Sequence, residues 1–204
     1  MAIITTRFKR RRLPHWEVAG KAYFVTFRLR GSLPQKIILQ LQAERKALND
    51  SDLETLLEFQ RHEFYEIEQI LDSVDNEQQA YLSRNEIAPL LMEAFNHLET
   101  IYCWRFPVWV IMSNHIHCLC IADKTGKKKT LTEIIALYKR YTGREINKVL
   151  NKTGRVWVDE NFDHWCRTPE KIESVKRYIL NNPVKAGLAK QSAVWPYSSI
   201  HAFR

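Results

Sequence analysis

Alternating apolar and polar residues predict four β-strands in this chain. In the first, every second residue from Tyr23 to Leu29 falls on one face, and Gly31 ends the segment. The apolar run from 104 to 122 is interrupted at Ser113 and Asn114, which predicts two strands joined by a short turn. The four strands are expected at residues 21–30, 104–112, 115–122 and 162–165.

Apolar residues spaced three or four positions apart predict helices between these strands. Ser51 and Glu54 form a capping box at the start of one helix, and Thr168 followed by Pro169 marks the start of another. That last helix is expected to end at the segment 181–183. The helices are expected at about residues 35–48, 51–72, 85–103, 131–150 and 169–183.

The order of these elements is strand, helices, strand, strand, helix, strand, helix. It predicts an α+β fold of the ferredoxin-like type, an antiparallel four-stranded sheet with helices on one face and the first and third strands in the centre. We expect a single domain over residues 1–204, with a long helical insertion at 33–102 and a C-terminal tail at 184–204 packed across it.

The charge of the chain points to a polyanionic partner. Among 204 residues, 31 are Lys or Arg and 23 are Asp or Glu, so the net charge is +8. Nucleic acid is the commonest partner of such proteins, although many basic proteins bind nothing in particular. The sequence shows no signal peptide and no apolar run long enough to cross a membrane, so we expect no membrane association and a cytoplasmic location. The four cysteines form no CxxC pair and are expected to be reduced, buried thiols.

Two short stretches carry the candidate chemistry. His115 and His117 flank one residue of a predicted strand, so both side chains point to the same face. Tyr178 and Asn182 are four apart on a predicted helix, which also places them on one face. Two imidazoles and an amide oxygen can hold one divalent cation with open positions, which suits Mg²⁺ or Mn²⁺. A tyrosine beside that cation could attack a phosphodiester. No residue is indicated as its general base.

Other interpretations of the histidines compete with a metal site. A bare His-x-His pair is weak evidence, and most such histidines are buried and hydrogen-bonded within a core. A zinc cluster that included Cys118 and Cys120 is disfavoured, because strand alternation turns these cysteines away from His115 and His117. A zinc deaminase would need His-x-Glu and PCxxC, which the sequence lacks.

Basic residues gather in three places that could contact DNA phosphates. The predicted DNA-binding residues are Lys139, Arg140 and Arg144 on the long helix, Lys127 and Lys128 in the loop before it, and Arg10, Arg11 and Arg12 in an N-terminal arm. The competing interpretation is a solvated helix face and a solvated tail.

Four segments together resemble a known family. They are NHIH within a strand, LTEIIALYKRYTGREIN, GRVWVDENFDHWCR, and RYILNNPVKAGL followed by WPYSS. They look like those of the REP-associated tyrosine transposases, which belong to the single-tyrosine HUH transposases. The insertion at 33–102 is longer than the shortest members require, and WVDEN stands where an aromatic-glutamine pattern is more usual.

The resemblance implies roles for individual residues. His115 and His117 would bind the metal, Asn182 would be a third ligand where relatives often carry glutamine, and Lys139 would lie near the DNA. Tyr178 would form a 5′-phosphotyrosine bond and free a 3′-OH. The partner would be single-stranded or hairpin DNA, and the enzyme a monomer or a homodimer.

We therefore expect metal-dependent nicking and strand transfer at hairpin-forming repeats. The alternative is a domesticated hairpin-binding protein without catalysis. A ferredoxin-like RNA-processing protein is a third possibility, weakened by the lack of an RNP1 motif.

Overall fold

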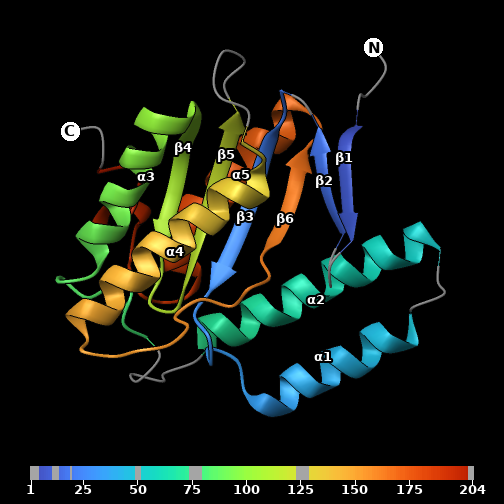
Figure 1. Cartoon of the computed structure of the whole chain (residues 1–204), viewed down its shortest axis with the longest axis horizontal. Helices are drawn as coiled ribbons and strands as arrows, with labels where there is room; N and C mark the ends of the chain where they lie inside the picture. Colours follow the sequence, from blue (N-terminus) through green and yellow to red (C-terminus); the bar gives the residue numbers. More distant parts are fainter. Residues whose placement is uncertain are drawn as a thin grey trace.

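The central feature of the fold is a four-stranded antiparallel sheet with the strand order β4-β5-β3-β6 (Figure 1). The computed structural model describes residues 5–10, 14–18, 20–48, 52–73, 80–122 and 129–201, with side chains described from residue 20 onward except Leu53. The strands are β3 (Ala22–Arg28), β4 (Trp104–Ile111), β5 (His115–Ala122) and β6 (Phe162–Cys166). The predicted fold class is confirmed, and the first and third predicted strands, β3 and β5, are central.

All five predicted helices are present, and side-chain caps mark the starts of α2, α4 and α5. They are α1 (Gln35–Ala47), α2 (Leu53–Ser73), α3 (Ala88–Tyr102), α4 (Leu131–Val149) and α5 (Pro169–Lys185). Thr130 and Glu133 form a capping box at α4, and the Thr168 side chain accepts a hydrogen bond from the Lys171 backbone N–H at α5. At α2 the carboxylate of Asp52 accepts from the Thr55 N–H at 2.9 Å, while the predicted cap, Ser51, lies outside the described residues.

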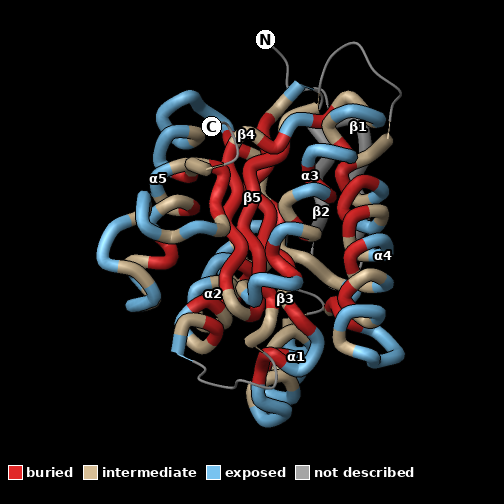
Figure 2. Tube along the Cα trace, turned by 90° about the vertical axis from the view of Figure 1, so that its left-hand side faces the viewer, coloured by how far each residue is buried: buried red, intermediate tan, exposed pale blue. Residues whose placement is uncertain are grey.

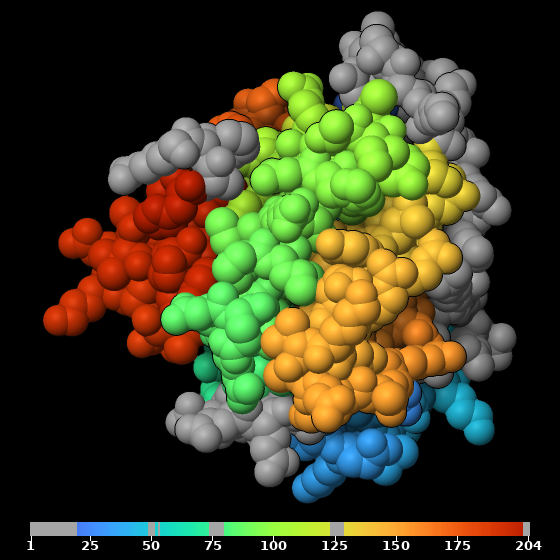
Figure 3. Space-filling view, turned by 60° about the vertical axis from the view of Figure 1, so that its left-hand side comes forward, coloured from blue at the N-terminus to red at the C-terminus, as the bar shows by residue number. Residues whose placement is uncertain are grey.

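Helices cover both faces of the sheet, because alternate residues of the central strands are apolar on each side. Val25 and Phe27 point to one face and pack with α3 and α4. Phe24 and Leu119 point to the other face and pack with α5 and with Phe64 of α2. Figure 2 shows the buried strands between α5 on one side and α3 and α4 on the other, and Figure 3 shows α3 and α4 (green and gold) side by side. The prediction placed helices on one face of the sheet. In the structure α3 and α4 cover one face, and α2 and α5 cover the other.

The end of α5 differs from the prediction. The helix was expected to stop at 181–183, but it continues to Lys185 with Pro183 inside it. Proline removes one backbone hydrogen bond from a helix. Here Asn182 and Pro183 are both buried, and the Pro183 carbonyl accepts N–H groups of Leu188 and Ala189 at 2.8 and 3.2 Å. Burial and these bonds offset the local cost of the proline.

The hairpin near the N-terminus and the short 3₁₀ helix near the C-terminus were not predicted from the sequence. β1 (Thr5–Arg10) and β2 (Pro14–Val18) pair as a separate antiparallel hairpin, in the region predicted as a basic arm. After α5 and a short 3₁₀ helix, η1 (Ser192–Val194), the chain runs beside β4, where the Ile111 N–H donates to the Tyr197 carbonyl at 2.9 Å. Within the described ranges, no helix has both the length and the apolar character needed to cross a membrane.

Candidate active site

The two histidines of β5 meet at the centre of the sheet. Their side chains point to the face covered by α5 and α2, and their Nε2 atoms lie 3.0 Å apart. His115 is 1% exposed and His117 is fully buried. Thr26 of β3 pairs with His117 in the sheet register, and its hydroxyl lies 2.7 Å from His117 Nδ1. The same-face orientation predicted from the His-x-His spacing is what brings the two imidazoles together.

Asn114, in the turn before β5, sets the orientation of His115. Its Nδ2 donates to the carbonyl of Leu71 at 3.0 Å, so its Oδ1 faces His115 Nδ1 at 2.6 Å and accepts the ring proton. The lone pair of His115 Nε2 is therefore directed toward His117. Burial, followed by the nearby charge of His117, lowers the pKa of His115 to about 3. Metal-binding histidines are commonly held neutral and oriented by such a second hydrogen bond.

Helix α5 brings Tyr178 and Asn182 to the same cluster. The Tyr178 ring packs edge-on against His117, with ring centroids 5.6 Å apart. Asn182 is 1% exposed, and neither atom of its amide has a hydrogen-bond partner among the described residues. Its amide makes the smallest of the upward contributions to the pKa of His115, as an acceptor near that imidazole does, but its distance and angle do not amount to a hydrogen bond. A buried amide without a partner is costly, so this group is poised for a ligand that the protein itself does not supply.

Glu68 of α2 completes the cluster, and the sequence interpretation missed it. Its Oε2 lies 3.1 Å from His117 Nε2 and accepts the Tyr178 hydroxyl hydrogen at 2.7 Å. The residue is 1% exposed, and its Oε1 has no partner among the described residues. The available signal was an acidic residue on the apolar face of a helix, four positions after Phe64 and three before Leu71.

The charges of the cluster oppose one another. Burial acts to raise the pKa of Glu68, but the charge of His117 and its hydrogen bond outweigh burial and lower this pKa to about 2. Burial, and then the charge of Glu68, raise the pKa of Tyr178 above its usual value. The tyrosine hydroxyl is therefore protonated at neutral pH, and Glu68 is ionised.

The donor set fits a divalent cation. Glu68, His115 and His117 each offer one ligand atom, and the three atoms lie within 4.8 Å of one another. Adjacent ligands of a six-coordinate ion at about 2.1 Å are about 3 Å apart, which matches the observed 3.0 and 3.1 Å separations. Carboxylate and amide oxygens with two imidazoles form a mixed donor set suited to several divalent metals.

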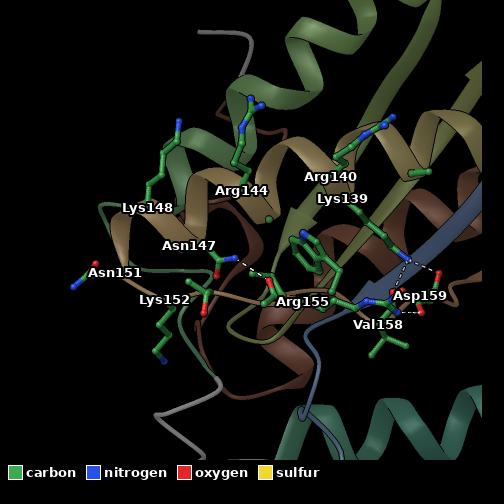
Figure 4. Close-up of a pocket in the computed structure, with 16 residues that line it drawn as sticks. Lys139, Arg140, Arg144, Asn147, Lys148, Asn151, Lys152, Arg155, Val158 and Asp159 are labelled. Carbon is green, nitrogen blue, oxygen red and sulfur yellow. Dashed lines mark hydrogen bonds and ion pairs between the residues drawn. The ribbon is translucent and has the colours of Figure 1, made fainter.

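The predicted helical DNA contacts lie on the other face of the sheet. Figure 4 shows the side chains that line a groove between α4 and the segment 151–159. The volume of this groove is about 970 Å³. Its basic lining residues are Lys139, Arg140, Arg144, Lys148, Lys152 and Arg155. Because α4 and α5 pack on opposite faces, the groove and Tyr178 are separated by the sheet.

Lys139 is placed differently from its neighbours in this groove. Its ammonium group donates to the carbonyls of Val158 and Asp159 at 3.0 and 3.3 Å (Figure 4). It also donates to the carbonyl of Glu160 at 3.4 Å. Burial lowers the pKa of this lysine to about 8. The ammonium therefore holds the segment before β6 in place.

The remaining predicted DNA contacts fall in the loop before α4 and in the N-terminal segment. Lys127, Lys128, Arg11 and Arg12 lie outside the described residues, as does the side chain of Arg10.

All four cysteines are free, and Cys118 and Cys120 lie on the face opposite the histidines, as strand alternation predicted.

Comparisons with known proteins agree with the resemblance seen in the sequence. The profile of the family described as "Transposase IS200 like" matches residues 36–182. A REP-associated tyrosine transposase from Escherichia coli (strain K12) is 27% identical over 93 residues, and the match covers 46% of this chain and 52% of that protein. The chain thus spans about half the length of this curated relative.

A solved structure of a REP-associated tyrosine transposase bound to a REP hairpin has the same fold. It superposes with a TM-score of 0.55 at 16% identity and covers 99% of this chain and 84% of that one. The family profile extends over well above half of the sequence and includes both histidines, the tyrosine and Asn182. The chain belongs to the IS200-like transposase family.

Proposed function

We propose that this protein nicks and rejoins single-stranded DNA at hairpin-forming sequences, with Tyr178 as the nucleophile. The observation that carries the proposal is the position of the Tyr178 hydroxyl. It donates to the buried oxygen Oε2 of Glu68, and the same oxygen contacts the His117 imidazole. Membership of a transposase family supports a DNA-processing enzyme.

His115, His117 and Asn182 would hold a Mg²⁺ or Mn²⁺ ion. The neutral imidazole of His115 directs its lone pair into the site, and the amide of Asn182 has no competing partner. Glu68 adds a negative charge to the same cluster. When bound, the cation supplies Lewis-acid polarisation of the scissile phosphate and stabilises charge on its oxygens.

The chemistry then follows from the tyrosine. Its oxygen attacks phosphorus, the new oxygen–phosphorus bond forms, and the bond to the 3′-oxygen breaks. The departing 3′-oxygen takes up a proton, so the products are a 5′-phosphotyrosine and a free 3′-OH. Burial raises the pKa of Tyr178, so the hydroxyl starts protonated. The proton that it loses on attack is balanced by the proton that the departing 3′-oxygen takes up. Attack of a 3′-OH on the phosphotyrosine reverses the step and joins strands.

The groove beside α4 is the part of this surface that suits a DNA backbone. Six basic side chains line it, and Arg140 and Lys152 make no ion pair with another described residue. Contact with these basic side chains would release the cations condensed on the DNA phosphates, which favours binding at low salt. The related transposase whose structure includes a REP hairpin supports a hairpin as the bound form.

The alternative is a hairpin-binding protein that no longer catalyses. One observation favours it: Tyr178 donates its hydroxyl hydrogen to Glu68, and its pKa is raised, so the tyrosine is not activated in this arrangement. The presence of the two histidines and Asn182 in one buried cluster favours catalysis.

Adduct formation separates the two. The protein is incubated with labelled hairpin-bearing single strands and Mn²⁺, resolved on a denaturing gel, and the adduct is mapped by peptide sequencing. We expect the label on Tyr178 and no adduct from Tyr178→Phe, while Tyr141→Phe, a half-exposed tyrosine on α4, reacts normally. A label on another residue, or an adduct from Tyr178→Phe, would overturn the assignment; hairpin binding without any adduct would support the alternative.

A further inference from the structure

We infer that Glu68 is a positioning residue that holds the Tyr178 hydroxyl beside His117, which makes helix α2 of the insertion a part of the active site. This inference rests on the proposed function. Nothing in the His-x-His and tyrosine segments requires such a helix, and the insertion at 33–102 had no role assigned to it by its sequence.

Helix α2 touches each element that supplies a catalytic side chain. It reaches β5 through Glu68 and His117, and it reaches the turn before β5 through the Leu71 carbonyl, which accepts from Asn114. The second of these contacts fixes the amide that orients His115. The helix therefore acts on both histidines, on one directly and on the other through Asn114.

The same helix is joined to α5 at two levels. Glu68 accepts the hydroxyl hydrogen of Tyr178, and one helical turn later Asp72 pairs with Lys185 at 2.9 Å. Phe64, one turn earlier, packs edge-on against Phe24 with ring centroids 5.7 Å apart, and Phe24 packs in the same way against Tyr178. The tyrosine ring is thus enclosed by α2 along with the sheet.

Burial makes a purely structural role for this carboxylate expensive. Glu68 is 1% exposed, and only one of its two oxygens has partners among the described residues. An apolar residue of similar size at this position would avoid the desolvation of a charge. The carboxylate of Glu68 is therefore assigned a functional role, because its Oε2 atom contacts both the proposed nucleophile and a proposed metal ligand.

The contact also limits the freedom of the nucleophile. A phenol ring packed only on its faces can still swing its oxygen and rotate its O–H bond. The 2.7 Å hydrogen bond fixes both, and the 3.1 Å contact from the same oxygen to His117 ties the phenol to the histidine pair. Groups that orient catalytic side chains in this way commonly change activity by about 10- to 100-fold when removed.

Two substitutions of Glu68 and one control test the inference. Glu68→Gln keeps an oxygen that can accept the tyrosine hydroxyl, Glu68→Ala removes it, and Glu58→Gln changes an exposed acid on the same helix. Adduct formation is timed at saturating hairpin DNA and Mn²⁺, and DNA affinity is measured separately. We expect Glu68→Ala to slow adduct formation about 10- to 100-fold with unchanged DNA affinity, Glu68→Gln to recover part of the rate, and the control to match the wild type.

A second readout does not depend on catalysis. Tyrosines are replaced biosynthetically by 3-fluorotyrosine, and the ¹⁹F signal of Tyr178 is assigned as the one missing from Tyr178→Phe. We expect that signal to shift in Glu68→Ala and to lie closer to the wild-type position in Glu68→Gln. An unchanged signal in Glu68→Ala would overturn the inference. So would a loss of DNA affinity in both Glu68 variants as large as their loss of adduct-formation rate. If the wild type forms no adduct, the proposed function fails, whereas the fluorine signal still decides whether Glu68 holds Tyr178.

Discussion

The Nε2 atoms of His115 and His117 lie 3.0 Å apart in the centre of the sheet, with Glu68 Oε2 3.1 Å from the second of them. Three potential acceptors converge on one buried point. Such an arrangement is stable only with a proton or a cation between the acceptors, and the orientation that Asn114 imposes on His115 directs a lone pair there.

The first prediction concerns metal binding by this pair. Replacing His115 or His117 with Ala removes one imidazole ligand, so we expect the affinity for Mn²⁺ to fall at least about 10- to 100-fold. Titration of Mn²⁺ followed by its electron paramagnetic resonance signal measures the free ion. His62→Ala changes an exposed histidine of α2 and serves as the control. Unchanged affinity in both active-site variants would remove the metal site from this position.

Replacing Asn182 with Leu should preserve or raise the stability of the metal-free protein and weaken metal binding. Its amide has no hydrogen-bond partner among the described residues, so Asn182→Leu replaces an unsatisfied buried group with an apolar one of similar size. The metal-free variant should be as stable as the wild type or more so. The increase in melting temperature on adding Mn²⁺ should shrink, because ligand binding stabilises only in proportion to affinity. An undiminished Mn²⁺ effect would exclude Asn182 as a ligand.

DNA binding should depend on salt through the groove beside α4. Each phosphate contact that is lost lowers the slope of log affinity against log salt by about 1. We expect this change for Arg140→Gln and for Lys152→Gln, with affinity measured by fluorescence anisotropy between about 50 and 200 mM salt. Lys36→Gln alters an exposed lysine of α1 and should leave the slope unchanged.

Lys139 should behave differently from these groove residues. Its ammonium donates to three backbone carbonyls, so Lys139→Gln should lower the free energy of unfolding by about 1 to 3 kcal/mol. Urea denaturation measures this loss. If the variant lost only DNA affinity and retained full stability, the structural role given to the ammonium would be wrong.

Acid should destabilise the metal-free protein in the pH range where His115 stays neutral. The imidazole titrates near 6.5 when unfolded and near 3 when folded, so between these values the unfolded chain binds a proton that the native state lacks. The free energy of unfolding should therefore fall as pH falls from about 6.5 toward 3. Glu68, with its pKa lowered to about 2, loses its own contribution as pH falls below 4.5.

Urea midpoints at several pH values between 7 and 4 test this slope. His115→Gln should show a shallower decline than the wild type. Part of the decline should persist, because burial also lowers the pKa of His164, to about 4. An identical pH dependence in the variant would show that His115 is not buried in the neutral form.

The elements that local pattern determines were predicted well. Strand alternation placed β3 and β5 and turned His115 and His117 to one face, since side chains of a strand alternate whatever it packs against. The cap at Thr168 marked the start of α5, because an N-cap satisfies N–H groups within the same turn. The i, i+4 spacing of Tyr178 and Asn182 was likewise a property of one helix.

Local pattern failed where charge or distant packing decides the outcome. Strand β1 carries the basic residues Arg7, Lys9 and Arg10, so it was interpreted as an arm, and the apolar alternation of Pro14, Trp16 and Val18 in β2 was overlooked. Helix α5 continues through Pro183 because the residues around it are buried and its carbonyl is bonded by the following turn. Neither result can be derived from propensity alone.

The sequence by itself therefore determined the individual strands of the sheet, the histidine pair and the tyrosine with its asparagine, since each depends on residues a few positions apart. The tertiary structure alone decided that Glu68 joins them. Its contact with Tyr178 spans 110 positions and exists only because α2 packs on the same face of the sheet as α5. It also turned Lys139 toward backbone carbonyls, because the segment before β6 passes over that lysine. Contacts of this kind depend on how whole elements pack, and no spacing along the chain encodes them.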